Sequence, residues 1–379
     1  MIAEHMNFIF YSVTGDFNSF HRKREIESIV SKSGAKALYF HNPQFFLKAL
    51  YKKFKNKAKK EGKVKGNIKV GSLYTLLPIS FALRSNTLMY FFVTLPIKVQ
   101  VSFAKKNFLG NELTINWFYK PDQYLYLKNA GRYIYLHYDN YKGDSNYKFS
   151  HYQSFDLTLK LCVESSLITL ISSSKLYERY KIFENENIYY YPNAISRELI
   201  NSKVLKCNSK VSKCIGFIGQ LDKTFDFDLI KKIAFTYPDY LIVLIGPEKD
   251  ELAVQELKFI KNVSLLGFMD YEQLSNKLQD FQLGICPYKI SDFNQYRNPL
   301  KIIEYFSYGI PVVTVSCDIS EEISDLVSVA EDHEQFIQAV KYELSKNTLE
   351  KQLARQSVAK ANCWDNRAEF VLKKLSVLN

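Results

Sequence analysis

The segment Asn298–Pro311, NPLKIIEYFSYGIP, carries the clearest chemical signal in the sequence. Asn298 is a good N-cap residue, and Pro299 suits the first position of a helix. Gly309 suits the position just after a helix, and Pro311 prevents the helix from continuing. The segment therefore predicts a short helix whose two ends are both marked.

Two charged residues of this predicted helix are spaced to bind a ligand together. Lys301 and Glu304 are three residues apart, so we expect them on one exposed face, while Ile302, Ile303 and Phe306 face a sheet. A helix N-terminus with a lysine attracts a diphosphate, and a carboxylate one turn later can pair with both ribose hydroxyls. The alternative is an ion pair on the surface of a structural helix.

Four predicted strands in the same half of the chain end in small or rigid residues. Parallel strands bind ligands beyond their carboxyl ends, and glycine allows a ligand to approach the backbone closely. The alternative for each position is a glycine or proline that merely closes a turn. The four turns are Gly219-Gln220, Gly246-Pro247, Gly267-Phe268-Met269 and Cys286-Pro287-Tyr288.

The elements that must position these residues are short runs of β-branched and aromatic residues, separated by helix-length segments. This alternation predicts an α/β fold with parallel sheets covered on both faces. The first series of predicted strands is 7–13, 35–41, 67–73, 113–119, 133–139 and 167–172. The second series is 214–219, 240–246, 263–267, 282–287 and 311–315.

A polar stretch between the two series, at about 193–210, predicts a boundary between two Rossmann-like domains in tandem. We expect an N-terminal domain at 1–195, a C-terminal ligand-binding domain at 196–350, and a helix at 351–379 that returns to the first domain. A chain of 379 residues is long enough for two such domains.

The composition is that of a globular protein, with 47% hydrophobic and 24% charged residues. The six cysteines are scattered, without a CxxC pair, which favours buried apolar side chains over a disulfide framework or a metal site. Because the N-terminal residues lack the pattern of a secretory signal, we expect a cytoplasmic protein.

Positive charge is concentrated in the first half of the chain. Residues 1–185 hold 28 Lys and Arg against 13 Asp and Glu, and nine lysines lie between Lys52 and Lys69. This pattern suits an anionic membrane surface, and a solvated loop is the alternative. No nucleic-acid motif accompanies the charge. The lysines assigned to the membrane are Lys52, Lys53, Lys55, Lys57, Lys59 and Lys60.

Two apolar runs, 73–83 and 87–97, are long enough to dock on a membrane but too short to span it.

The stretch Cys214–Val315 resembles the donor-binding domain of GT-B glycosyltransferases, above all in Asn298–Val313 and the preceding Gly284–Tyr288. Within that superfamily, the chain resembles the bacterial glucuronosyltransferase-like enzymes of xanthan and teichuronic acid synthesis. In the first half, Ile115–Asp122 and Tyr133–Asp139 are similar to the strand, turn, helix and strand that precede the active-site aspartate in these enzymes. The resemblance implies transfer of a sugar from a nucleotide sugar, UDP- or GDP-linked, to a lipid-linked or polysaccharide acceptor at the inner face of the cell membrane.

Two details bear on the mechanism that the resemblance implies. Retaining members commonly have an acid eight positions before the ribose-binding glutamate, where this chain has Tyr296, so we expect an inverting enzyme. Asp226-Phe227-Asp228 looks like a metal-binding DxD motif, but Asp226 more simply caps a helix that begins at Phe227. We therefore expect transfer without a metal ion or a cofactor.

The resemblance suggests a role for each candidate residue. Phe268 and Met269 are expected near the base, Glu304 at the ribose, and Lys301 with Tyr288 at the diphosphate. Lys223 is a weaker candidate for the phosphates, and the remaining donor-site candidates are Gly219, Gly246, Pro247, Asn298 and Pro299.

An inverting transfer also needs a base for the acceptor hydroxyl. We expect Asp139 to be this base, with Asp144 as an alternative in the following loop. His137, two residues earlier on the same strand face, suits a packed structural role better than catalysis. His21 and Arg22 are candidates for binding an acidic acceptor, or else for the start of a solvated helix.

Three other functions compete with this one. A nicotinamide-dependent oxidoreductase would need GxGxxG after a strand, and Gly216 and Gly219 supply only GxxG. A sugar-nucleotide epimerase of the same fold does not account for the basic first half. A non-catalytic protein that binds anionic membrane surfaces would not bind nucleotides.

Overall fold

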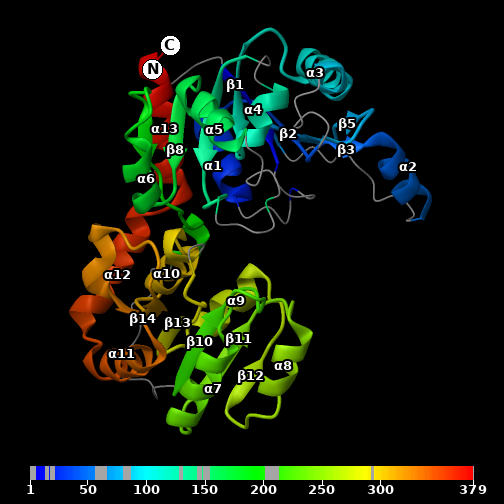
Figure 1. Cartoon of the computed structure of the whole chain (residues 1–379). Helices are drawn as coiled ribbons and strands as arrows, with labels where there is room; N and C mark the ends of the chain where they lie inside the picture. Colours follow the sequence, from blue (N-terminus) through cyan, green and yellow to red (C-terminus); the bar gives the residue numbers. More distant parts are fainter. Residues whose placement is uncertain are drawn as a thin grey trace. The chain divides into compact units, whose positions relative to one another are not determined.

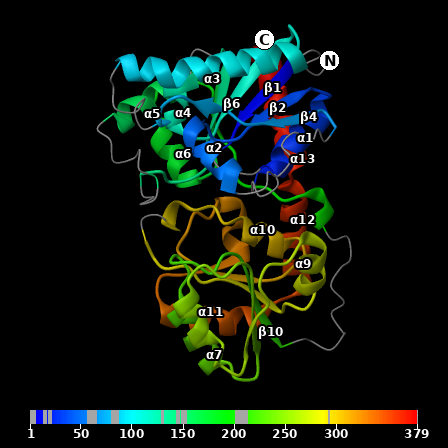
Figure 2. The same cartoon turned by 90° about the vertical axis from the view of Figure 1, so that its right-hand side faces the viewer.

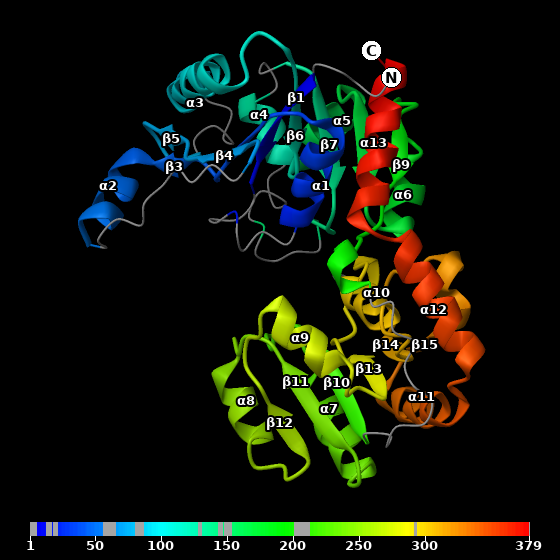
Figure 3. The same ribbon diagram turned by 180° about the vertical axis from the view of Figure 1, so that it is seen from behind.

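The computed structural model describes residues 6–12, 17, 22–55, 66–79, 87–127, 131–142, 147, 154–200, 213–291 and 294–378. The chain divides into two compact units, Met1–Tyr191 with Trp364–Asn379, and Pro192–Cys363. Figures 1 to 3 show the elements of both units from three sides. The main sheet of each unit is parallel, and the predicted α/β class is confirmed.

The first unit contains a seven-stranded parallel sheet in the order β4-β2-β1-β6-β7-β8-β9. Its central strands are buried along their whole length, as expected of a parallel sheet covered on both faces. The strands are β1 (Met6–Tyr11), β2 (Ala37–Phe40), β4 (Ile68–Gly71), β6 (Leu113–Phe118), β7 (Tyr133–His137), β8 (Ile168–Ile171) and β9 (Ile188–Tyr190). A separate two-stranded sheet pairs β3 (Gln44–Phe45) with β5 (Tyr74–Thr75).

Helices of the first unit cover both faces of this sheet (Figures 1 and 3). The helices are α1 (Lys23–Ser33), α2 (Phe46–Lys55), α3 (Thr87–Phe108), α4 (Pro121–Leu127), α5 (Phe155–Glu164), α6 (Ser174–Tyr180) and α13 (Trp364–Leu378). The last helix joins this unit because α13 packs on α1. Ser28 Oγ donates to Asp365 Oδ1 over 3.0 Å, and Lys32 Nζ lies 2.6 Å from Glu369 Oε1.

The second unit contains a six-stranded parallel sheet in the order β12-β11-β10-β13-β14-β15. The strands are β10 (Cys214–Ile218), β11 (Leu241–Ile245), β12 (Val263–Leu265), β13 (Leu283–Cys286), β14 (Val312–Val315) and β15 (Val327–Ala330). The helices are α7 (Phe227–Thr236), α8 (Glu251–Leu257), α9 (Tyr271–Leu278), α10 (Leu300–Phe306), α11 (His333–Lys346) and α12 (Leu349–Ala361). Three 3-10 helices lie at η3 (Arg197–Leu199), η4 (Asn294–Tyr296) and η5 (Glu321–Leu326).

The strand order of the second sheet reverses direction between β10 and β13. Open α/β sheets bind ligands at such a switch point, beyond the carboxyl ends of the strands. In this unit the switch point lies between Gly219, which follows β10, and Pro287, which follows β13. The topology therefore places two of the predicted glycine and proline turns together.

The end of the chain is not one helix. The predicted return of the C-terminal helix to the first domain is confirmed for α13, but a single helix over 351–379 is wrong, because α12 belongs to the second unit. Thr348 caps α12 through a hydrogen bond to the amide of Lys351, and α12 ends at Asn362. The Asn362 carbonyl accepts a 3.1 Å hydrogen bond from the amide of Ile195, which ties the end of α12 to the start of the same unit.

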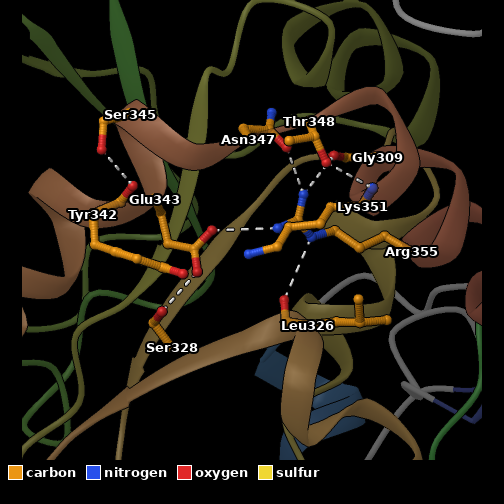
Figure 4. A network of polar contacts seen from close by, with 10 residues as sticks. All are labelled: Gly309, Leu326, Ser328, Tyr342, Glu343, Ser345, Asn347, Thr348, Lys351 and Arg355. Atoms are coloured by element: carbon orange, nitrogen blue, oxygen red, sulfur yellow. Dashed lines mark hydrogen bonds and ion pairs between the residues drawn. The ribbon is translucent and has the colours of Figure 1, made fainter.

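A buried ion pair joins α11 to α12 (Figure 4). The Arg355 side chain is fully buried, and its Nη2 atom lies 3.3 Å from Glu343 Oε2. The Nη1 atom donates to Asn347 Oδ1 over 2.8 Å and to the Gly309 carbonyl over 3.3 Å. Glu343 also accepts a 2.6 Å hydrogen bond from Ser328. Arg355 thus connects α11, α12 and the residue that ends α10.

Candidate functional site

Two glycines at the carboxyl edge of the second sheet form turns that admit no side chain. Gly219 and Gly246 have φ values of 153° and 147°, which L side chains rarely adopt. The two turns touch, since a Cβ atom on Gly246 would lie 1.8 Å from the Gly219 carbonyl oxygen. The Gly219 amide donates to the Ile245 carbonyl, and the Gly246 amide to the Gly267 carbonyl. Neither position has room for a side chain.

Lys301, the second residue of α10, lies against the first of these glycines. A Cβ atom on Gly219 would be 2.3 Å from Lys301 Cε and 3.1 Å from its Nζ atom. The Nζ atom is also 5.9 Å from the centroid of the Tyr288 ring and 6.0 Å from that of Phe217. Burial lowers the pKa of Lys301, but the neighbouring Tyr288 and Glu304 raise it more, so the ammonium group stays charged.

A second cation, which the sequence analysis did not single out, shares the Tyr288 ring with Lys301. The guanidinium carbon of Arg297 lies 4.9 Å from the centroid of this ring. The buried Tyr288 comes directly after β13 and so places both cations at the switch point. The four-residue spacing of Arg297 and Lys301 is the sequence signal for this pair, although Arg297 precedes the helix predicted within Asn298–Pro311.

Glu304 is buried, which corrects the prediction that it shares an exposed face with Lys301. Its exposed fraction is 8%, because α10 is buried on all sides from Ile302 onward. Burial raises the pKa of the Glu304 carboxyl, and Lys301 offsets only part of that effect. The carboxylate accepts no hydrogen bond from any residue that the structure describes. The carboxylate is therefore available to a ligand that donates hydrogen bonds.

The predicted ends of α10 are partly wrong. The helix begins at Leu300, so Pro299 is the N-cap residue and Asn298 lies outside the helix. Asn298 is instead engaged by Asn193, whose amide donates to Asn298 Oδ1 and whose Nδ2 atom donates to the Asn298 carbonyl. The other end is as predicted, since Gly309 has a φ of 70° and its amide donates to the Phe306 carbonyl.

The remaining donor-site candidates follow the same edge of the sheet. Phe268, after β12, is exposed, whereas Met269 is partly buried against the core. The Pro247 carbonyl accepts a hydrogen bond from the Leu221 amide and so joins the loops after β10 and β11. Lys223 lies in an open depression between these loops, together with Asp222, Lys249, Asp250, Glu251 and Leu252.

Asp226 caps a helix, as predicted. Its Oδ1 atom accepts a 2.9 Å hydrogen bond from the Leu229 amide at the start of α7. Its Oδ2 atom lies 2.8 Å from Nε2 of His333. Within the described ranges no three His, Cys, Asp or Glu side chains are grouped to hold a metal ion. Tyr296, the position at which retaining relatives carry an acid, ends the 3-10 helix η4.

In the first unit, the proposed base Asp139 lies beyond its strand. Strand β7 ends at His137, so the prediction that Asp139 and His137 share a strand face is wrong. Asp139 lies in a bend, partly exposed, where its Oδ1 atom accepts a 3.0 Å hydrogen bond from the Asn140 amide. Its carboxylate therefore stands at the carboxyl edge of the first sheet.

His137 is packed inside the first unit, as expected. Its Nδ1 atom lies 2.6 Å from the Tyr135 hydroxyl and 2.7 Å from the Tyr180 hydroxyl, and the Tyr141 ring packs on the imidazole. Burial lowers the pKa of His137 to about 3, so the ring is neutral near pH 7. The structure gives His137 a structural role.

Arg22 does not face solvent, which corrects its assignment to the acceptor. Its side chain is fully buried, and Nη1 lies 3.1 Å from Glu25 Oε1. The guanidinium carbon lies 5.5 Å and 5.4 Å from the ring centroids of Tyr138 and Trp364. Because the Arg22 charge is buried and has these partners, the residue has a structural role in the first unit.

Several other candidates lie outside the described residues or have side chains that are not described. These are His21, Asp144, Lys57, Lys59 and Lys60, with the side chains of Lys52, Lys53 and Lys55 in α2. Of the helices in the described ranges, none combines the length and apolarity required to cross a membrane.

Comparison with protein families matches residues 212–346 to the model described as glycosyl transferases group 1. This match covers the sheet, the two glycine turns and α10 of the second unit. Among curated proteins, the chain is similar to the putative teichuronic acid biosynthesis glycosyltransferase TuaH of Bacillus subtilis (strain 168), with 30% identity over 135 residues. That match spans 34% of this chain and 34% of the relative.

Solved structures match over nearly the whole chain. The Anabaena Alr3699/HepE structure in complex with UDP and glucose has a TM-score of 0.67 and 12% identity, covering 98% of this chain and 100% of that one. An E. coli trehalose-6-phosphate structure bound with UDP-2-fluoro glucose has a TM-score of 0.65 and 13% identity, covering 97% of this chain and 98% of that one. At this identity the likeness shows the fold. Together the comparisons confirm the resemblance to GT-B glycosyltransferases.

Proposed function

We propose that this chain, a GT-B protein whose second unit carries a glycosyl transferases group 1 domain, transfers a sugar from a nucleotide sugar to a glycan or lipid-linked acceptor. The family match and the glycosyltransferase relative support the assignment to this enzyme class. UDP is our first choice of nucleotide because the similar Anabaena structure holds UDP.

One observation carries the proposal: two cations and two glycine turns meet at the switch point of the second sheet. Lys301 lies against Gly219, and Arg297 shares the Tyr288 ring with Lys301. An ammonium and a guanidinium group beside turns that carry no side chain suit the oxygens of a diphosphate. The two cations offset the charge that a metal ion would otherwise neutralise, so we propose that transfer needs neither metal ion nor cofactor.

We place the ribose and the base of the nucleotide next to this diphosphate site. Glu304 has a buried carboxylate that no described residue satisfies, and the two hydroxyls of a ribose are suitable donors. Phe268 is an exposed ring at the same edge of the sheet, available to stack on the base. Met269 contributes less than the sequence suggested, because it packs partly into the core.

We assign the base to Asp139 of the first unit. The acceptor hydroxyl attacks the anomeric carbon, its proton passes to the Asp139 carboxylate, and the bond from the anomeric carbon to the diphosphate breaks with its electron pair on the leaving oxygen. Lys301 and Arg297 stabilise the negative charge that develops there. A tyrosine at position 296, in place of an acid, favours this inverting route.

We further propose that the enzyme works on the cytoplasmic face of the cell membrane. The basic first half of the chain, and above all the lysines between Lys52 and Lys69, supports electrostatic attraction to anionic lipids. A lipid-linked acceptor would be presented at that surface.

A panel of nucleotide sugars incubated with the protein and a bacterial membrane extract tests the proposal. We expect release of one nucleoside diphosphate together with labelling of the extract, without added metal. If nucleotide sugars bind but the sugar is only rearranged, the epimerase alternative is correct. If none binds, a non-catalytic membrane-binding protein is the better description.

A further inference from the structure

Helix α3 exposes a continuous apolar stripe on the surface of the first unit. Its members recur every fourth residue, so they lie on one face of the helix. They are Phe91, Leu95, Val99 and Phe103, with exposed fractions of 52%, 42%, 59% and 71%. Phe92, beside the stripe, is also exposed. At 1.5 Å per residue the stripe is about 18 Å long.

The opposite face of α3 is fixed to the unit, so the helix cannot turn its stripe inward. Val93, Ile97 and Val101 are buried. Gln100 makes two hydrogen bonds to the backbone of Tyr74 in β5, accepting from its amide over 3.1 Å and donating to its carbonyl over 2.7 Å. The outward direction of the stripe is therefore set by packing and by a specific polar contact.

A second exposed apolar group lies on the same flank of the unit. Figure 2 shows α2 and α3 on the side that faces the viewer, and the small sheet of β3 and β5 connects them. Leu47 and Tyr51, one turn apart on α2, have large exposed fractions, and Phe46 packs edge-on against Tyr74 of β5. Apolar surface of this extent marks an interaction site in a soluble fold.

The charges around the stripe identify its partner. Neither α2 nor α3 contains an acidic residue, whereas Lys48, Lys98, Lys105 and Lys106 flank the apolar side chains. A second copy of the same face would bring like charges together and add no carboxylate to pair with them. Anionic lipid headgroups above an apolar layer complement both features.

We propose that the outward face of α3 inserts into the interface of an anionic bilayer, with the helix lying along the membrane surface. This surface differs from the lysine-rich segment already assigned to the membrane, since it supplies apolar contact that high salt does not abolish. The inference is independent of the transfer reaction, because none of these residues belongs to the donor site.

Vesicle sedimentation tests the proposal with a matched pair of variants. The double variant Phe91→Ser/Phe103→Ser should lose affinity for phosphatidylglycerol-containing vesicles by about 100-fold or more, since each buried aromatic ring contributes roughly ten-fold or more. The control Phe235→Ser/Phe259→Ser changes two rings of the second unit that are 89% and 86% exposed. The control should bind vesicles like the unchanged protein.

A spectroscopic readout locates the stripe without removing it. The two native tryptophans, Trp117 and Trp364, are buried. In Val99→Trp we expect a blue-shifted emission that brominated lipids quench, and in Phe259→Trp neither effect. Unchanged vesicle binding by the serine double variant, or no quenching of residue 99, would overturn the proposal. If the serine variant instead abolishes self-association of the protein, the stripe is an interface between copies and the proposal is likewise overturned.

Discussion

The side chain of Lys301 lies across the Cα atom of Gly219, so that a single Cβ atom at residue 219 would stand 2.3 Å from Lys301 Cε. Strand β10 and helix α10 thus place a glycine turn and an ammonium group at one point. Position 219 has to be glycine for two reasons, its φ of 153° and the volume that Lys301 occupies.

Gly219→Ala should displace Lys301 and reduce affinity for a nucleoside diphosphate by about ten-fold or more, as measured by calorimetry. Gly110→Ala is the matched control. Gly110 has a φ of 76°, and a Cβ atom there would meet no atom within 4 Å. Gly110→Ala introduces backbone strain of about 1–2 kcal/mol but no steric clash. The control should therefore keep its affinity for the nucleoside diphosphate. Equal affinity of the two variants would show that the contact between Gly219 and Lys301 is irrelevant to binding.

Glu304→Gln should weaken nucleotide binding and make it less dependent on pH. Burial raises the pKa of Glu304 above the ordinary value of 4.5, so the wild-type carboxylate is protonated at a higher pH than an exposed one. Wild-type affinity should therefore fall as the pH decreases towards that raised value, whereas the glutamine variant should give a flat profile. A pH series of nucleotide affinities measures the difference, and two parallel profiles would refute the ribose assignment.

The same variant should stabilise the fold at neutral pH. A glutamate with a raised folded-state pKa stabilises the protein in its protonated form, and this contribution is lost as the pH rises through that pKa. Glutamine does not lose a proton, so Glu304→Gln should unfold at a higher temperature than wild type at pH 7, with the difference disappearing below about pH 4.5. Thermal unfolding at both pH values checks this expectation.

Arg355→Met should destabilise the second unit by about 3–5 kcal/mol, because it leaves the buried Glu343 without its cation. The double variant Arg355→Met/Glu343→Leu removes both charges and should recover most of that loss. Urea unfolding followed by circular dichroism measures the two effects. A double variant as unstable as the single one would mean that the Arg355 contact with the Gly309 carbonyl, rather than the ion pair, holds the unit together.

Asp139→Asn should lower turnover by roughly 10² to 10⁴ while leaving nucleotide affinity unchanged, because it removes the proton acceptor and keeps the shape of the side chain. Initial rates of transfer and calorimetry on the same preparation separate the two quantities. Asp144→Asn is the comparison variant. If Asp139→Asn remains active while Asp144→Asn is inactive, the base has been misassigned. If both variants retain activity, a retaining mechanism replaces the inverting one.

Much of the fold was predictable from sequence because the buried strands of a parallel sheet are local signals. The runs at 133–139 and 214–219 became β7 and β10, each ending one or two residues earlier than expected. Strands β9 and β15 were missed. Each is only three or four residues long, and Ser328 and Val329 of β15 are not fully buried, so neither strand stands out as an apolar run.

The predictions that were wrong concern residues whose contacts in the structure are distant in the sequence. The sequence near Arg22 predicts a surface residue, but in the structure its guanidinium group lies against Trp364. The sequence near Asn298 predicts an N-cap, but in the structure this residue is hydrogen-bonded to Asn193. The burial of Glu304 and the position of Arg297 likewise follow from packing at the switch point. The apolar run 87–97 was predicted to dock on a membrane, but its outward-facing residues could not be identified, because an apolar residue looks the same in the sequence whether it is buried or exposed.

The binding of a nucleoside diphosphate to Lys301→Ala, compared with the unchanged protein, tests the central claim most directly. Lys301 is assigned to the diphosphate itself, so calorimetry with UDP should show a ten- to hundred-fold loss of affinity, the contribution of a charged hydrogen bond. Lys289→Ala is the control, since Lys289 is an exposed lysine one residue after Tyr288. We expect the control to bind like wild type. UDP affinity that is unchanged in Lys301→Ala would contradict the donor site described for this protein.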